Sequence, residues 1–128
     1  MKLVLAYPHR RLNPNNRSYS YGGKREEDKL RSKQKKESWS IAKQEIANQR
    51  SQAWCKELQI SDTNVHVQMT FHAATKRGRD RDNHIAMMKG ALDGIALAIG
   101  INDNRFIPSV EWGDIRKPPC VIVELMEL

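Results

Sequence analysis

The strongest constraint on the fold is a stretch from residue 26 to residue 58 that contains neither proline nor glycine. Apolar side chains recur in it at the spacing of an amphipathic helix, so we predict one long helix over 26–58. Its first part is almost entirely charged, which fits either a solvated helical arm or a basic surface for phosphates. The recurring apolar residues are Trp39, Ala42, Ile46, Ala47, Ala53, Trp54 and Leu58.

Strands are expected on both sides of this helix. Residues 2–7 are short and apolar, and the prolines and the Gly-Gly pair in 8–24 predict a loop there. Residues 65–71 alternate apolar and polar side chains, which is the pattern of a half-buried strand. Because His66 and His72 belong to the polar positions, we expect both to be exposed and neither to bind metal.

The C-terminal half adds a second helix and two strands. An apolar stripe predicts a helix over 84–99 that ends at Gly100. Strands are expected at 106–112 and 120–128, after turns or loops. With no internal repeat or linker, the chain is predicted to form one domain over 1–128. Its class is α+β, a small mostly antiparallel or mixed sheet packed with two main helices.

Charge is unevenly distributed along the chain. The formal net charge is +7; residues 1–58 hold 14 Lys and Arg against 6 Asp and Glu, whereas residues 59–128 hold 8 against 9. A basic excess of this size favours a polyanionic partner, usually nucleic acid, although a soluble protein with a high isoelectric point is the plain alternative.

Membrane and disulfide chemistry are not indicated. No run of 18 apolar residues occurs, so no membrane-spanning segment is expected. Cys55 and Cys120 lie far apart and in no metal-ligand spacing. We therefore expect reduced, partly buried thiols in a cytoplasmic protein.

The segment RGRDRDN, residues 77–83, places Asp80 and Asp82 one residue apart among three arginines. It fits a charge-balanced loop in which Asp82 or Asn83 caps the following helix. Lys89 and Asp93 are four apart, the spacing of an ordinary ion pair on a helix surface. These explanations leave Asp80 without a role.

The same acids also fit a divalent metal site. Mg²⁺ takes oxygen ligands and keeps several waters, so it needs only a few carboxylates and a substrate phosphate. Asp103, at a turn before a strand, is the third candidate ligand. Such a metal activates water, and Lys89 would stabilise negative charge that develops at the phosphate.

The order of these motifs resembles the RusA-type Holliday junction resolvases, small endodeoxyribonucleases of bacteriophages and prophages. The resemblance spans an asparagine–proline loop, a basic helix, an alternating strand, D-x-D-N, a helix with Lys and Asp, and G-I-N-D before a strand. It implies an α/β homodimer in the host cytoplasm that nicks four-way DNA junctions symmetrically. It also implies that Asp80, Asp82 and Asp103 bind Mg²⁺, with Mn²⁺ as a substitute, and that Lys89 assists cleavage.

Asn83 and Asp93 match the family pattern as well, but two positions depart from it. The family lysine usually follows the asparagine by three residues, where this chain has Ala86, and Lys89 follows by six. An Asp-Asp pair is common before the last strand of the motif, where this chain has Asn102-Asp103. Three residues is nearly one helical turn, so positions 86 and 89 lie on the same face of a helix, and Asp103 aligns with the functional acid of the family.

Basic residues near the acids are the predicted DNA contacts. Arg81 lies between the two acids and is equally explained as a solvated side chain. Two other functions stay open: a non-catalytic DNA-binding module, and a metal phosphohydrolase acting on nucleotides, which the lack of a glycine-rich phosphate loop disfavours. The predicted contacts are Arg17, Lys76, Arg77, Arg79, Arg81 and Arg105.

Helix length predicts how the acids are arranged. A straight helix over 84–99 is roughly 24 Å long. The four residues from 100 to 103 return at most about 13 Å. Asp103 would then be out of reach of Asp82 in its own subunit, which predicts a metal site shared between the two subunits of a dimer.

Overall fold

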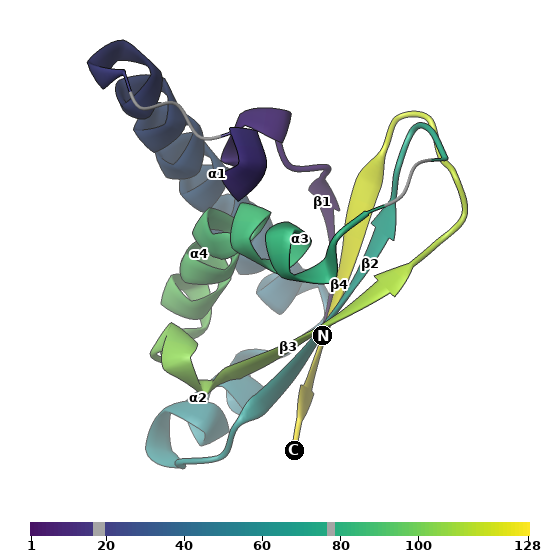
Figure 1. The fold of residues 1–128 in the computed structure, drawn as a ribbon. Coiled ribbons are helices and arrows are strands. Elements are labelled where there is room, and N and C mark those ends of the chain that lie inside the picture. Colours follow the sequence, from purple (N-terminus) through teal and green to yellow (C-terminus); the bar gives the residue numbers. More distant parts are fainter. Residues whose placement is uncertain (17–19, 77–78) are drawn as a thin grey trace.

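The computed structural model describes residues 1–16, 20–76 and 79–128. In this part of the chain, four α-helices and four strands form one α+β unit, which confirms the predicted class (Figure 1). Short 3-10 turns complete it: η1 (Arg10–Leu12), η2 (Pro14–Asn16) and η3 (Asp103–Arg105). The main elements are β1 (Lys2–Ala6), α1 (Tyr21–Asn48), α2 (Gln52–Ile60), β2 (Val65–His72), α3 (Arg81–Met87), α4 (Lys89–Ile99), β3 (Phe106–Trp112) and β4 (Cys120–Glu127).

The sheet is mixed, with strand order β1-β4-β2-β3. β4 runs antiparallel to both β1 and β2, whereas β2 and β3 are parallel. Parallel neighbours need a crossover connection, and α3 and α4 supply it. Figure 1 shows α1 and α4 side by side on one face of the sheet.

The core lies between this face and the helices. The apolar positions of β2, from Val65 to Phe71, are fully buried, as the alternation predicts. The predicted apolar stripe of the second helix is also largely buried, with Ile95 and Ile99 inaccessible to solvent. Cys55 is buried, Cys120 is half-buried, and both are free thiols. None of the helices in the described part of the chain combines the length and apolar character needed to cross a membrane.

Two glycines allow α4 to lie unusually close to α1. A Cβ atom on Gly94 would lie 2.1 Å from Ser38 Oγ and 2.3 Å from the carbonyl oxygen of Lys35. On Gly90 it would lie 2.8 Å from the carbonyl oxygen of Arg31. Backbone atoms cannot give way as a side chain can, so larger residues here would force the helices apart. This contact fixes α4 on α1 and thereby the position of the α3–α4 crossover.

The prediction of one helix over 26–58 is wrong, because the stretch forms two helices, α1 and α2, and the first begins before residue 26. The helix begins at Tyr21, because Ser20 caps it through a bond from Gly23 N to its hydroxyl (3.1 Å), and it ends at Asn48. Arg50 adopts a left-handed conformation (φ 53°), with bonds from Ser51 N to Ile46 O (2.9 Å) and from Arg50 N to Ala47 O (3.2 Å). This pattern is a Schellman motif, which usually places glycine where this chain has Arg50.

The helix predicted over 84–99 is two helices, so the straight-helix premise is also wrong. α3 ends at Met87, Met88 leaves helical geometry (φ −94°, ψ 5°), and α4 begins at Lys89. Gly100 closes α4 in the left-handed region (φ 90°), which confirms the predicted C-cap. The crossover therefore bends directly before Lys89.

The expectation that both β2 histidines are exposed is wrong for His72. His66 is half-buried and bonds Ser109 Oγ (2.8 Å), whereas His72 is buried and its Nδ1 lies 2.9 Å from the carbonyl oxygen of Asp114. Gly113 covers the ring so closely that a Cβ there would lie 2.2 Å from His72 Cε1. The loop after β3 thus folds over a position that alternation assigns to the polar face.

Candidate active site

Asp80 is the residue that begins α3. It has extended backbone geometry, and its Oδ1 accepts a hydrogen bond from Asn83 N (3.1 Å), so Asp80 is the N-cap. The prediction that Asp82 or Asn83 caps the helix is therefore wrong. Asp82 lies exposed in the first turn. Capping holds the Asp80 carboxylate at a defined place between β2 and α3.

A buried histidine, His84, forms a hydrogen bond with the backbone of Asp80. His84 is only 6% exposed, and its Nδ1 donates to the carbonyl oxygen of Asp80 (3.0 Å). Because that oxygen only accepts, Nε2 is left as the acceptor for the Tyr7 hydroxyl (2.8 Å). Burial lowers the pKa of His84, so the ring is neutral near pH 7. A chain of hydrogen bonds thus runs from the end of β1 to the backbone of Asp80.

Sequence reasoning missed Tyr7 and His84. The available signal was a histidine four residues after Asp80, the spacing that brings a helical side chain near the N-cap carbonyl. Two aromatic rings pack against the His84 ring and hold it in this position. The ring centroids of Phe71 and Trp112 each lie 4.9 Å from that of His84, edge to face. Tyr7 comes from a segment 77 residues away, so no local pattern identifies it as the partner.

A polar pocket of about 470 Å³ opens over this arrangement. It lies where η1 and η2 approach α3 and the end of β2. Asp80 lines it, whereas Asp82 and Asp103 do not belong to its lining. The asparagine–proline loop and the D-x-D-N segment, which are far apart in the sequence, both contribute to this lining. Its polar lining residues are Tyr7, Arg10, Asn13, Asn15, Thr75, Arg79, Asp80, Asn83 and His84.

Those predicted DNA-binding cations that the structure describes divide into three groups. Arg79 lines the pocket and donates to the carbonyl oxygen of Thr75, and Lys76 is exposed nearby. Arg81 donates to the carbonyl oxygen of Val110 (2.5 Å), so it does not simply project into solvent. Arg105 turns inward, where it donates to the carbonyl oxygens of Leu58 (2.7 Å) and Thr63 (2.6 Å). Arg17 and Arg77 lie outside the described residues.

Lys89, Asp93 and Asp103 form a separate surface cluster, in which Lys89 is exposed and the two carboxylates are half-buried. The Lys89 ammonium contacts Asp93 Oδ1 (3.0 Å), which confirms the expected helix-surface pair, and it also contacts Asp103 Oδ2. The hydrogen bond from Lys89 lowers the pKa of Asp103, and hydrogen bonds to Asp103 and then Asp93 raise the pKa of Lys89. Lys89 is therefore a stable cation, and Asp103 is already matched with a positive charge.

The three predicted metal ligands do not gather in one chain. Across residues 1–16, 20–76 and 79–128, no three side chains of His, Cys, Asp or Glu are arranged to hold a metal ion. A three-carboxylate site inside one subunit thus does not fit. Of the three, only Asp80 lines the polar pocket, and a Mg²⁺ ion needs only a few carboxylates because it keeps several waters and takes phosphate oxygens.

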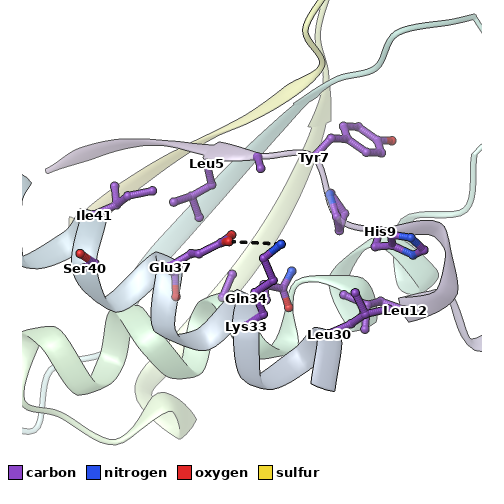
Figure 2. Close-up of a pocket in the computed structure, with 14 residues that line it drawn as sticks. Leu5, Tyr7, His9, Leu12, Leu30, Lys33, Gln34, Glu37, Ser40 and Ile41 are labelled. Carbon is purple, nitrogen blue, oxygen red and sulfur yellow. Dashed lines mark ion pairs between the residues drawn. The ribbon is translucent and has the colours of Figure 1, made fainter. Parts of the chain in front are cut away.

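A second cavity, of about 450 Å³, lies between β1 and α1. Figure 2 shows Leu5, Leu30 and Ile41 around it and the ion pair between Lys33 and Glu37, whose charged atoms are 3.8 Å apart. None of the predicted site residues that the structure describes lines this cavity. Among its described lining residues the one carboxylate, Glu37, is paired with Lys33.

Comparison with models of known protein families found no match to this chain, and comparison with curated protein sequences also found none. The features that point to a function are therefore the pocket at Asp80 and the order of the motifs around it.

Proposed function

We propose that the protein is a Mg²⁺-dependent endodeoxyribonuclease of RusA type that nicks four-way DNA junctions. The observation that supports it most is the pocket in which Asp80 shares a lining with Arg10, Arg79 and three asparagines. A carboxylate alone repels phosphate, and neighbouring guanidinium groups offset that repulsion. A pocket with both charges suits a phosphodiester that must be bound and then attacked.

The residues of the pocket have distinct roles in this proposal. Arg10 and Arg79 bind phosphate oxygens of the DNA backbone, while Asp80 and Asp82 hold Mg²⁺ or Mn²⁺. When bound, the ion supplies an activated water and offsets charge on the phosphate. His84 and Tyr7 act as positioning residues, because their hydrogen bonds fix the backbone of Asp80. Asn83 supports the same carboxylate through its backbone N–H.

Asp103 enters the site across a homodimer. Since Asp103 pairs with Lys89 within its own chain, it is outside the pocket at Asp80. In the proposed dimer, Asp80 and Asp82 meet Asp103 of the partner subunit, together with the Lys89 that accompanies it. Lys89 keeps its proton near pH 7 and so serves as a fixed positive charge for the departing oxygen.

The test is an incubation with three substrates: a synthetic four-way junction, a linear duplex of matched sequence and a nucleotide, each with and without Mg²⁺. We expect paired nicks in the junction, only with Mg²⁺, and little change in the duplex. Hydrolysis of the nucleotide alone would instead identify a phosphohydrolase. Denaturing gels of strands labelled one at a time would reveal whether the two nicks are symmetric.

A second candidate is a DNA-binding module without catalysis. One observation favours it: capping by Asp80 and pairing of Asp103 with Lys89 give both acids roles in the fold. It predicts junction binding at every Mg²⁺ concentration and no cleavage at any. The same incubation, with binding followed on native gels, separates the two functions.

A further inference from the structure

A smaller hollow, of about 300 Å³, adjoins the polar pocket at Asp80. The two share Ala73, Thr75 and Arg79 in their linings, so they open on either side of the segment that follows β2. The hollow has a different chemistry: Trp112, Phe71 and Ile115 form an apolar wall, and Lys76 and Arg79 add positive charge.

Trp112 is a rigid and partly exposed platform in this hollow. It ends β3 opposite Phe71 of β2, and the two ring centroids lie 5.7 Å apart. His84 meets the indole edge to face at 4.9 Å. Despite these contacts, 38% of Trp112 is exposed to solvent. The core therefore fixes the ring in place while part of its surface remains uncovered.

The loop after β3 is anchored, so the apolar wall of the hollow is formed before any ligand arrives. Gly113 N donates to the carbonyl oxygen of Phe71 (3.0 Å), and Arg116 N donates to that of Ala73 (3.0 Å). His72 holds the same loop through Asp114. Between these anchors Ile115 is 49% exposed beside the tryptophan. A preformed apolar surface loses little conformational entropy when a ligand packs on it.

An indole beside two cations matches the chemistry of a nucleotide. Every nucleobase has a π-face that stacks on an aromatic side chain, and its phosphate is attracted by Lys and Arg. A hollow of about 300 Å³ is at the small end of ligand sites and admits one base, whereas a base pair still stacked in a duplex cannot enter it.

We propose that the hollow at Trp112 binds one unstacked nucleobase of the strand whose phosphate enters the pocket at Asp80. This inference rests on the proposed nuclease function and adds the source of its structure selectivity. A linear duplex must break stacking to supply such a base, whereas a branch point offers bases that are already partly unstacked. Trp112 is then a specificity-determining residue that favours branched over linear DNA.

Photocrosslinking tests the contact directly. A four-way junction carrying 5-iododeoxyuridine at the branch point is irradiated with the protein in EDTA, so that no strand is cut. Trypsin releases Trp112 in the peptide 106–116 and Trp39 in the separate peptide 37–43, as the positions of Lys and Arg require. We expect the crosslink on Trp112. Trp39, on α1 and 40% exposed, is the matched control.

Affinity measurements complete the test. Trp112→Leu should weaken junction binding by about tenfold, the effect typical of a lost base–aromatic stack, and change duplex binding by less than about twofold. Trp112→Phe should restore most of the junction affinity, because a ring remains. Trp39→Leu should leave both affinities unchanged. Thermal unfolding of each variant checks the fold, and the crosslink to the wild-type protein tests the contact if Trp112→Leu does not fold.

The outcomes separate this inference from the proposed function. Crosslinking to Trp112 without cleavage in Mg²⁺ would support the base site and reject the nuclease. Cleavage of junctions without that crosslink would overturn the base site alone. Equal loss of junction and duplex affinity in Trp112→Leu would also overturn it, and a wild-type protein that binds no DNA would overturn both.

Discussion

The two acidic regions of this protein differ in how their carboxylates are held. At the start of α3, Asp80 is fixed by a helix cap and by a buried histidine, and it lines a pocket with two arginines. After α4, Asp103 is exposed to solvent on one side and paired with Lys89 of its own chain. The first carboxylate is positioned by uncharged groups and stays available, whereas the second is already neutralised.

For the proposed nuclease, this difference indicates which region would organise the chemistry. A carboxylate held by a backbone N–H and supported through its carbonyl keeps its full charge for a cation. A carboxylate matched with an ammonium must exchange that partner before it can bind a metal. In the proposed nuclease, Asp80 is thus the better-prepared metal ligand, and Asp103 would join it when a dimer brings it against the pocket of the other subunit.

The largest expected effect is the loss of cleavage in Asp80→Asn. Asparagine caps helices as well as aspartate does, so the fold and junction binding should persist. Loss of a residue that merely supports a metal ligand typically costs 10–100-fold, so loss of the ligand itself should slow cleavage by at least about 100-fold. Single-turnover rates on a labelled junction, with affinity measured in EDTA, provide the comparison. Asp82→Asn and Asp103→Asn should behave alike.

The matched control is Asp80→Ala, which should lose the cap as well and unfold more easily by about 1 kcal/mol. Near-wild-type nicking by any of the three asparagine variants would remove that residue from the proposed site.

Mixed dimers test whether the two regions meet. Asp82→Asn chains are mixed with Asp103→Asn chains under conditions of subunit exchange. A site shared between subunits regenerates one intact centre and one doubly damaged centre in each heterodimer. We therefore expect nicking of one strand to return, without paired resolution of the junction.

The control is either variant alone, taken through the same exchange. If exchange is verified independently and nicking does not return, the shared site is rejected and Asp103 must act, if at all, within its own chain.

The elements that were predicted well are those whose pattern is local. The alternation of β2, the apolar stripe of α4 and the glycine at its end each depend on neighbours within a few residues. The ends of β3 also match the prediction. The break after Asn48 was missed because the left-handed position holds Arg50, and no residue there signals a helix end.

The arrangement around Asp80 was predicted only in part because its contacts are distant in sequence. Asp80 lines a pocket, but its role as the cap required choosing among three polar residues within four positions. His84 depends on Tyr7, and His72 is buried by a loop some 40 residues later. When a distant segment buries a polar side chain, the local alternation of apolar and polar residues does not change, so the sequence pattern cannot predict that burial.

Stability measurements should sharpen the contrast between buried and exposed groups. His84→Ala removes a ring from the core and its hydrogen bonds to the Tyr7 hydroxyl and the Asp80 carbonyl, and the carbonyl keeps only the backbone N–H of residue 84. We therefore expect a loss of about 1–3 kcal/mol in the free energy of unfolding. Lys89→Ala breaks an exposed cluster and should cost about 0–1 kcal/mol. Urea unfolding at pH 7 measures both. A larger loss in Lys89→Ala than in His84→Ala would contradict the assignment of the two regions.

The smallest expected effect is the pH dependence of the exposed cluster. The pKa of Asp103 is lowered from its ordinary value of 3.8, so its contribution to stability is fully present above that value and is lost as the pH falls through the folded pKa. The pKa of Lys89 is raised from 10.5, so its contribution is present below 10.5 and is lost as the pH rises through the folded pKa.

Between these limits the difference in unfolding free energy between wild type and Asp103→Asn should be constant and below about 1 kcal/mol. In EDTA it should shrink at the acid end as Asp103 takes up its proton and at the alkaline end as Lys89 loses its own. Asp62→Asn, in the exposed turn before β2, is the matched control for removal of one surface charge. A difference that persists unchanged in acid would mean that Asp103 stabilises the fold through packing, and the charge-based contrast between the two regions would then fail.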